Sequence, residues 1–571
     1  MGKNSLKLLS VSSHKKFLAW AILATSLALP STSFAADLPV DAGTVQALRT
    51  GIDPAQELRR TQEEIENERI RREMEEHRES AGGIDAPAPK DETAAPAVKF
   101  VLHDVVLDST ELIPSDVVKS SYADFIGKET SIDDLYKIVA NLNDWYKKHN
   151  YLTCRAYLPP QTIHEGVVHI ALIEGKNGNV SIEGNTTTRD GYIKDRLGIE
   201  EGKIEDMSEL NEKLEWFNGT NDVKLHITLK AGEKTGTTDY VIEAYEPKRD
   251  AWTLYMDRAG SETTGRWRRG IFYTNRSLTG MRDALSLGYI NAQGLDSVSM
   301  SYAFPVGRSG TRLSLDYSRN STEVINGIYV DWDIPVRGHA TSYGLTLTQP
   351  LSVTGRGKTE ASFAISRTRS DTDILELPML RDRFQDFTAA LARTNYGDGW
   401  ACYRKYAYTF GSWDSDSEYQ FRESKNYSIF NFNGIYQRGA KHGQLFTVRT
   451  SAQWSLTDDL RPSKQFFIGG VTTVRGYPEN EIGADKGAVV SLEYSVPASK
   501  GVSLYTFFDW GHLFGDTTYD EKTLMGAGLG VRAKLFDGCA LDMAAGFPLK
   551  KDVARTHVDS CRLHLSLVAN F

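Results

Sequence analysis

The region from residue 248 to residue 571 is a succession of short segments in which apolar and polar side chains alternate. In one of them Leu313, Leu315 and Tyr317 alternate with polar residues, and clusters of Gly, Asn, Asp or Ser separate the segments. A period of two predicts β-strands with one apolar and one polar face. The region is therefore expected to form either a soluble β-sandwich or a membrane β-barrel with a water-filled lumen.

The last segment favours the barrel. Leu563, Leu565, Leu567 and the terminal Phe571 share one face, while His564 lies on the other. Outer-membrane barrels resemble this chain in ending on such a strand with a terminal aromatic residue. At about 20 residues for each strand and its loop, the region holds about sixteen antiparallel strands, and bacterial barrels have even numbers. A barrel of that size leaves an aqueous channel wide enough for an extended chain or a helix.

The composition excludes several classes of protein. The chain has 66 Lys and Arg against 75 Asp and Glu, so its net charge of −9 argues against a nucleic-acid-binding protein. No apolar run of about 20 residues follows the first thirty positions, which excludes a helical membrane protein with many spans. No phosphate-binding loop, nucleophile elbow or zinc-binding His motif occurs, so we expect no enzyme activity, no metal and no cofactor.

The four cysteines show no metal-binding spacing. Cys539 and Cys561 flank one predicted hairpin and could pair in an oxidising compartment. Four buried or lumenal thiols are an equally good interpretation.

The first 97 residues divide into three parts. Residues 1–35 have the lysines, apolar stretch and small-residue cleavage site of a secretory signal peptide. Residues 36–80 contain a charged helix that begins at Asp53-Pro54 and has no good apolar stripe, so it lies either in solvent or inside a water-filled cavity. Residues 81–97 are rich in Gly, Pro and Ala and are expected to be a mobile tether.

Two small α+β units of the order βααββ are predicted next, at residues 98–175 and 176–247. In the first, Val101 to Leu107 is predicted to be a strand, and Ser131 with Asp134 caps a helix that carries an apolar face. The second repeats the order with strands near Val180 to Glu183, Val223 to Leu229 and Thr238 to Ala244.

The first of these units resembles a polypeptide-transport-associated (POTRA) domain of the two-partner secretion transporters, the TpsB family. The resemblance is in Tyr146, Tyr151-Leu152, Leu158, Pro159, Pro160, Gln161, Gly166 and Ile173-Glu174-Gly175. Ala231-Gly232-Glu233 before Asp239-Tyr240 similarly resembles the end of the second such domain. Among these, Pro159, Gln161, Gly166, Glu174 and Gly175 are the candidate POTRA motif residues.

A long connection between the strands Phe446 to Trp454 and Ala488 to Val496 contains the candidate site. Three glycines allow it to turn sharply, so we expect the loop to fold back on itself. Its sequence Val474, Arg475, Gly476, Tyr477 resembles the inward-folding loop motif of the family. Phe507 and Asp509 resemble the F-x-D motif that the family has on the barrel wall.

The alternation of side chains places Asp509 on the same face as Ser503, Tyr505 and Phe507, which we expect to face the lumen. A carboxylate there could accept two hydrogen bonds from the guanidinium of Arg475. The alternative is that Arg475 is an ordinary solvated arginine of a surface loop, with no partner in the lumen. The glycines at 526, 528 and 530 are expected to line a crowded part of the wall.

The resemblance implies an outer-membrane transporter, with POTRA domains in the periplasm, that exports a large β-helical exoprotein in an unfolded state. It also implies that the charged helix is a removable plug and that the barrel-assembly machinery inserts the chain among outer-membrane lipids. An insertase of the same superfamily usually carries more POTRA domains. A passive porin with periplasmic domains, and a barrel-bound enzyme, are the alternatives from other classes.

Overall fold

The computed structural model describes residues 53–76, 83–85, 99–417, 420–515, 521–553 and 556–571. The predicted signal peptide lies outside these residues. The chain forms two compact units, one made of the helix α3 (Pro54–Glu76) with residues 248–352 and 356–571, the other of residues 80–247 and 353–355. Among the described residues, no helix has the length and apolar character needed to span a membrane.

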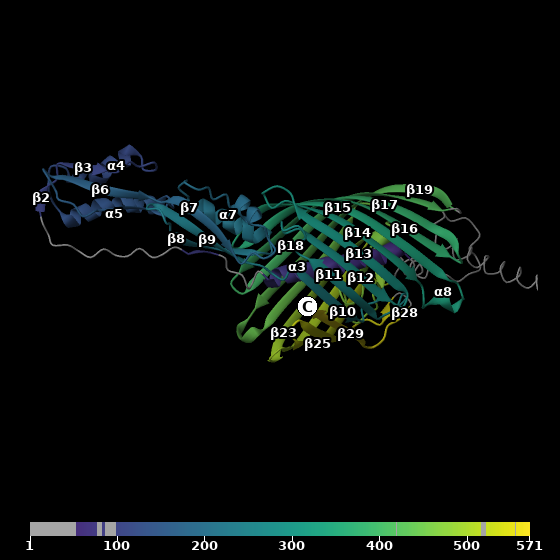
Figure 1. Ribbon diagram of the computed structural model, residues 1–571. Coiled ribbons are helices and arrows are strands. Elements are labelled where there is room, and N and C mark those ends of the chain that lie inside the picture. The colour runs from purple at the N-terminus through teal and green to yellow at the C-terminus, as the bar shows by residue number, and fades with distance from the viewer. Residues whose placement is uncertain (1–52, 77–82, 86–98, 418–419, 516–520, 554–555) are drawn as a thin grey trace, which may run out of the picture. The chain divides into compact units, whose positions relative to one another are not determined.

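The region after residue 247 is a closed barrel, one of the two folds that the alternation allowed, and its sixteen strands agree with the number estimated from its length (Figure 1). The last strand pairs with the first from Thr253↔Asn570 to Asp257↔Ser566, which closes the sheet. In chain order the strands are β10 (Asp250–Asp257), β11 (Arg268–Asn275), β12 (Ala284–Ala292), β13 (Leu295–Pro305), β14 (Arg312–Glu323), β15 (Val336–Thr354), β16 (Gly357–Ile374), β17 (Leu377–Gly397), β18 (Trp400–Ser417), β19 (Gln420–Gly439), β20 (Leu445–Ser455), β23 (Lys486–Ser499), β24 (Val502–Phe514), β25 (Thr523–Phe536), β26 (Cys539–Pro548) and β29 (Arg562–Asn570).

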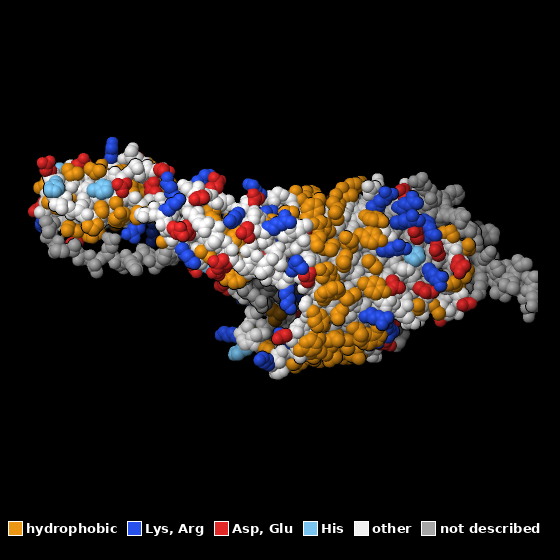
Figure 2. All heavy atoms as spheres, viewed as in Figure 1, with side chains coloured by type: hydrophobic (Ala, Val, Ile, Leu, Met, Phe, Trp, Pro, Cys, Tyr) orange, Lys and Arg blue, Asp and Glu red, His pale blue; other side chains and the backbone are white. Residues whose placement is uncertain are grey.

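Apolar side chains cover the outside of this barrel. Figure 2 shows them as a band with charged side chains beyond it on the barrel. Tyr343, Phe363 and Leu563 are among the most exposed, at 59%, 61% and 57%. Large apolar groups left in water at this density would be unfavourable, whereas in a bilayer they meet acyl chains. The barrel is a membrane barrel and not a soluble sandwich.

The helix α3 (Pro54–Glu76) lies inside the barrel (Figure 1). It begins where the sequence predicted, with the Asp53 carboxylate accepting a hydrogen bond from the backbone N–H of Ala55 at 2.9 Å. The sequence left two environments open for this helix, solvent outside the barrel or a polar cavity. The structure places it in the cavity, which is the lumen of the barrel.

The second unit contains two βααββ folds. The first has β3 (Asp104–Leu107), α4 (Ser115–Tyr122), α5 (Ile132–Lys148), β5 (Cys154–Tyr157) and β6 (Val167–Glu174), with the sheet order β3-β6-β5. The second has β7 (Lys176–Glu183), α6 (Asp190–Leu197), α7 (Met207–Thr220), β8 (Lys224–Ala231) and β9 (Thr237–Tyr245). Each fold buries its own apolar core between helices and sheet.

Two details of this unit differ from the sequence predictions. The strand predicted from Val101 to Leu107 is broken into β2 (Lys99–Val101) and β3, because buried Leu102 turns the chain: its N–H donates to Lys128 and that of His103 to Gly166. Part of the predicted tether forms β1 (Ile84–Asp85), which pairs in parallel with β8 and places Ile84 against the core.

The cap of α5 yields a test of the first βααββ fold. The Ser131 side chain accepts from the N–H of Asp134, and the Asp134 carboxylate accepts from the N–H of Ser131 at 3.1 Å. Ser131→Ala should cost about 1 kcal/mol, so the first-turn amides of α5 should exchange with deuterium about fivefold faster. Hydrogen exchange of the full chain in detergent checks this, with Ser120→Ala on α4 as the control. Equal exchange in both variants would contradict the cap.

Candidate functional site

The connection from β20 to β23 folds back into the barrel. It contains the short strands β21 (Phe466–Ile468) and β22 (Ile482–Ala484), which pair antiparallel. We call residues 469–481, between these strands, the inward loop. Gly469 and Gly470 open it with φ of 111° and 104°, a region that favours glycine. A Cβ at Gly470 would lie 2.0 Å from the Glu479 carboxylate, so the turn closes tightly around that group.

Arg475, at the tip of the inward loop, meets Asp509 on β24. Its Nε lies 2.7 Å and its Nη2 2.8 Å from the two carboxylate oxygens, a bidentate pair as the sequence predicted. Its backbone N–H also donates to Asp509 at 3.0 Å. The two residues are 5% and 0% exposed. Removing one partner of such a buried pair typically costs about 3–5 kcal/mol, because the other charge stays buried alone.

A second carboxylate, Glu493 on β23, completes the site. It accepts from Arg475 at 3.1 Å, from Arg532 at 2.6 Å and from Arg449 at 3.3 Å. Burial lowers the pKa of Arg475, but Asp509 and Glu493 outweigh this and raise it, so the guanidinium stays charged. The guanidinium also lies over the ring of Phe507, 3.5 Å from its centroid. Glu493 is not among the site residues predicted from the sequence, although its place among the alternating lumenal residues of β23 could have indicated it.

Glycine allows the loop tip to touch the barrel wall. A Cβ at Gly526 on β25 would lie 2.0 Å from the backbone oxygen of Arg475, and one at Gly546 on β26 would lie 2.6 Å from the nitrogen of Gly476. Gly476 itself has a φ of 101°. The glycine positions of β25 thus line a crowded wall, as predicted.

Val474 and Tyr477 anchor the two sides of Arg475. Val474 is fully buried in an apolar cluster with Ile468 and Leu524. The Tyr477 hydroxyl lies 2.8 Å from the backbone oxygen of Lys550 and accepts from the N–H of the same residue at 3.2 Å. Every residue of the Val-Arg-Gly-Tyr sequence therefore has a separate contact that holds the tip against the wall.

Helix α3 is held in the lumen by hydrogen bonds to strands around the barrel. The bonds join Arg59 to Gln453 on β20 (3.1 Å), Gln62 to Ser318 on β14 (2.8 Å), Glu64 to Arg268 on β11 (2.9 Å), Glu66 to Lys405 on β18 (3.3 Å) and Asp53 to Ser370 on β16 (2.9 Å). Small apolar contacts add to them, with Leu58 against Ala340 and with Ile70 and Met74 against Tyr403. The helix is fixed mostly by polar groups that water could also satisfy.

The candidate POTRA motif residues build the first βααββ fold. Gln161 donates to and accepts from the backbone of His169, at 2.6 and 2.7 Å. Glu174 accepts from Thr110, Glu111 and Tyr146. Burial and this carboxylate raise the pKa of Tyr146 above its ordinary value.

The remaining three candidate residues, Pro159, Gly166 and Gly175, lie between strands. A Cβ at Gly166 or Gly175 would lie 2.2 or 2.5 Å from a neighbouring backbone oxygen. Pro159 accepts a long hydrogen bond from Gln161 through its backbone oxygen. All of these contacts of the motif are within its own domain.

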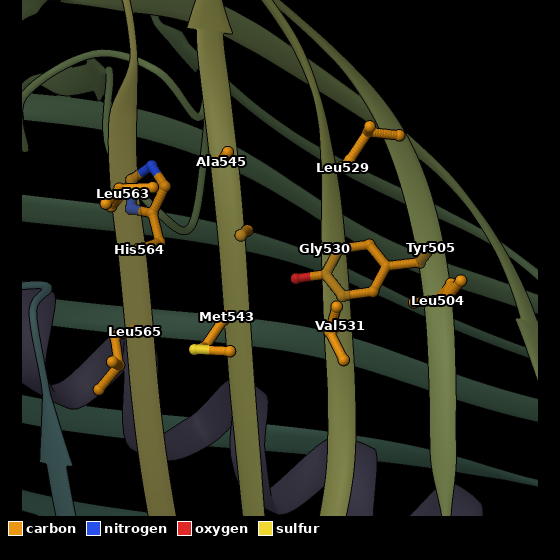
Figure 3. Close-up of a pocket in the computed structure, with 11 residues that line it drawn as sticks. Leu504, Tyr505, Leu529, Gly530, Val531, Met543, Ala545, Leu563, His564 and Leu565 are labelled. Carbon is orange, nitrogen blue, oxygen red and sulfur yellow. The ribbon is translucent and has the colours of Figure 1, made fainter. Parts of the chain in front are cut away.

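A hollow of about 500 Å³ lies on the wall formed by β24, β25, β26 and β29. Figure 3 shows Leu529, Met543 and Leu563 around it, next to the small residues Gly530 and Ala545. The three large side chains are exposed on the apolar outer face. These large side chains belong to the lipid-facing surface, whereas His564, which also lines the hollow, contacts the inward loop at Gly476.

The cysteines do not pair. All four are free, with Cys539 buried and Cys561 exposed. The structure therefore has thiols and not a Cys539–Cys561 disulfide, but the exposed Cys561 and half-buried Cys402 show that the thiols are not all buried.

Comparison with known proteins gives two family matches. A profile described as haemolysin secretion/activation protein ShlB/FhaC/HecB matches residues 236–533, just over half of the chain. A profile described as a POTRA domain of the ShlB type matches residues 100–175.

Individual relatives agree with these matches. The heme/hemopexin transporter protein HuxB of Haemophilus influenzae is 22% identical over 509 residues, covering 83% of this chain and 88% of that protein. The outer membrane transporter CdiB of Escherichia coli is 22% identical over 491 residues, covering 82% and 81%.

Two solved structures share the fold. CdiB from Escherichia coli has a TM-score of 0.64 at 18% identity and covers 90% of this chain and 98% of that one. BamA from Haemophilus ducreyi, lacking POTRA domains 1–3, has a TM-score of 0.51 at 12% identity and covers 83% and 100%.

Substitution of Gly526 tests the docking of the loop tip. In Gly526→Ala the added methyl group collides with the backbone oxygen of Arg475, so the tip should leave the wall. The backbone N–H of Arg475, which donates to Asp509 in the docked position, should then exchange with deuterium at least about fivefold faster than in the wild type. The matched control is Ala527→Ser on the opposite face of β25. If this N–H exchanges at the same rate in the wild type and both variants, the tip is not held by this contact.

Proposed function

The chain belongs to the ShlB/FhaC/HecB family of haemolysin secretion and activation proteins, and we propose how this outer-membrane transporter exports its partner exoprotein. The partner crosses the barrel in an unfolded state, while the inward loop stays docked on the wall and α3 leaves the lumen. The observation that carries the proposal is the buried Arg475–Asp509 pair inside a closed barrel whose lumen is occupied by a polar helix.

The inward loop is docked more strongly in the lumen than α3 is. This difference supports a fixed loop and a helix that leaves. The inward loop is docked by a buried bidentate ion pair, a buried apolar residue and glycine contacts, which water cannot replace cheaply. Helix α3 is docked mainly by hydrogen bonds and ion pairs, several of them partly exposed. Exchanging such contacts for water costs little. The loop is then the fixed wall of the channel, and the helix is the removable plug.

Strand addition is the proposed way in which the POTRA domains capture the partner. Antiparallel and parallel sheets both have edges whose backbone groups can pair with an extended segment. In the first domain β5 lies at one edge of the sheet, and in the second β7 does. The partner then threads the channel and folds outside as a β-helix, where burial of apolar surface makes return unfavourable.

The alternative functions have less support. A passive porin gives no role to two βααββ domains or to a loop fixed by buried charges. The likeness to BamA is one of fold alone, and the family match is to secretion proteins. We further propose that the barrel-assembly machinery inserts the chain and that it has no catalytic activity of its own.

Removing either member of the ion pair should abolish export. Arg475→Ala and Asp509→Ala each leave one charge buried without its partner, so the inward loop should lose its docked position. We expect both variants to insert into the outer membrane and to remain heat-modifiable on gels, but to secrete less than about a tenth of the wild-type amount of exoprotein. Arg475→Lys should also secrete less, because an ammonium group cannot contact Asp509 and Glu493 as a guanidinium fork does.

The control for these variants is Arg337→Ala, which removes an exposed arginine paired with Glu323 on the barrel. It should secrete normally. Secretion at the wild-type level by both Arg475→Ala and Asp509→Ala would rule out a role for the pair. The assay is the amount of exoprotein in the medium when candidate partners are co-expressed with this transporter.

Deleting the helix tests the plug. A variant without residues 54–80 should have a larger mean conductance in planar bilayers, because α3 no longer occupies the lumen. Replacing the same residues by a flexible Gly/Ser segment of equal length controls for the change in chain length and should behave as the deletion does. Conductance that stays at the wild-type level in both would remove the plug assignment.

A further inference from the structure

A buried cluster of charged groups joins α3 to the inward loop at a point separate from Arg475. Its members are Glu57, Arg60 and Glu64 on α3, Asp257 on β10, Arg268 on β11 and Glu479 in the loop. Their side chains are between 2% and 20% exposed. Two arginines therefore face four carboxyl groups in a place that is largely closed to water.

Glu479 is the carboxyl group of this cluster with the longest distance to its arginine partner. Arg268 lies 2.9 Å from both Asp257 and Glu64, and Arg60 lies 2.7 Å from Glu57. The ion pair that joins Glu479 to Arg60 is longer, at 3.9 Å, which is beyond hydrogen-bond distance. The hydrogen bond recorded for the Glu479 carboxylate, among the described residues, comes from the N–H of Val471 at 2.9 Å.

From this geometry we infer that Glu479 is a positioning residue for the plug, and that seating α3 in the lumen couples to the uptake of one proton by this carboxyl group. The inference rests on the plug role proposed above. With Glu479 neutral, the cluster has two positive and three negative groups. With Glu479 ionised it would have a fourth negative charge beside Glu64 and little solvent to stabilise it.

The direction of the pH dependence follows from where the proton binds. Burial raises the pKa of Glu479 to about 7 while α3 is seated, and the charge of Arg60 opposes this only in part. When α3 leaves, water reaches the carboxyl group and its pKa falls toward the ordinary value. The seated state thus binds the proton more tightly, so its stability is greatest at low pH and is lost as pH rises toward 7.

Other charged and titratable groups lie near Glu479. The charged groups that face Glu479 are Arg60 and Glu64 from α3 and Arg268 from β11, while Tyr255 of β10 lies beside Arg268. His564 of β29 contacts the loop at Gly476 and is a second titratable group in the region. The variants below separate its contribution from that of Glu479.

Single-channel recording of the full chain in planar bilayers tests the inference. The open probability of the wild type should rise about tenfold between pH 5.5 and pH 7.5. Glu479→Gln, which keeps a neutral side chain of the same size, should stay mostly closed and change less than about twofold. Glu63→Gln removes the same charge from an exposed position of α3 and should keep the wild-type dependence on pH.

Three results would overturn the inference: a wild-type channel indifferent to pH, a Glu479→Gln channel with the wild-type pH dependence, or a Glu479→Gln channel that is open at both pH values. The last would mean that the side chain is only structural. The variant without residues 54–80 separates this from the proposed function. If that deletion leaves conductance unchanged, the plug role itself fails, whereas if it opens the channel and Glu479→Gln follows the wild type, only the proton coupling fails.

Discussion

A charged residue placed inside a membrane barrel must find a counter-charge or water, and the lumen of this barrel is organised by that constraint. Arg475 satisfies it by docking on Asp509 and Glu493, which fixes the tip of a long loop against β23, β24 and β25. The glycines at 476, 526 and 546 are needed because only a backbone without side chains can come this close to the wall. The inward loop therefore forms part of the channel wall, and its tip is as buried as the residues of a protein core.

Helix α3 obeys the same constraint with weaker contacts. Outside the cluster around Glu479, its polar side chains form hydrogen bonds and ion pairs with strands around the lumen. Such contacts specify where the helix sits without making its departure costly, because water offers equivalent partners. The cluster around Glu479 is the exception, since four carboxyl groups and two arginines are buried together where the helix meets the loop.

Much of this architecture could be predicted because alternation and register are local properties. The faces of β24 follow from residue parity, so Asp509 was correctly expected to point into the lumen and to meet Arg475. The polarity of residues 54–76 reduced the environments of the helix to two. The capping box at Ser131 was visible in the sequence and is present in the structure.

The contacts that could not be predicted depend on packing between distant elements. Glu493 gathers arginines from β20, β25 and the inward loop, and no local pattern in the sequence gives the register that brings these together. The burial of Glu479 among charged groups also could not be predicted, because it depends on the packing of α3 against the inward loop. The pairing of Ile84 and Asp85 with β8 likewise needs the edge of a sheet that forms over a hundred residues later.

Electron microscopy of the transporter stalled with a segment of its exoprotein in the barrel would test the central claim most directly. The account predicts the exported chain in the place of α3, with Arg475 still within hydrogen-bond distance of Asp509. A stalled complex with α3 still seated in the lumen, or with Arg475 and Asp509 separated, would contradict it.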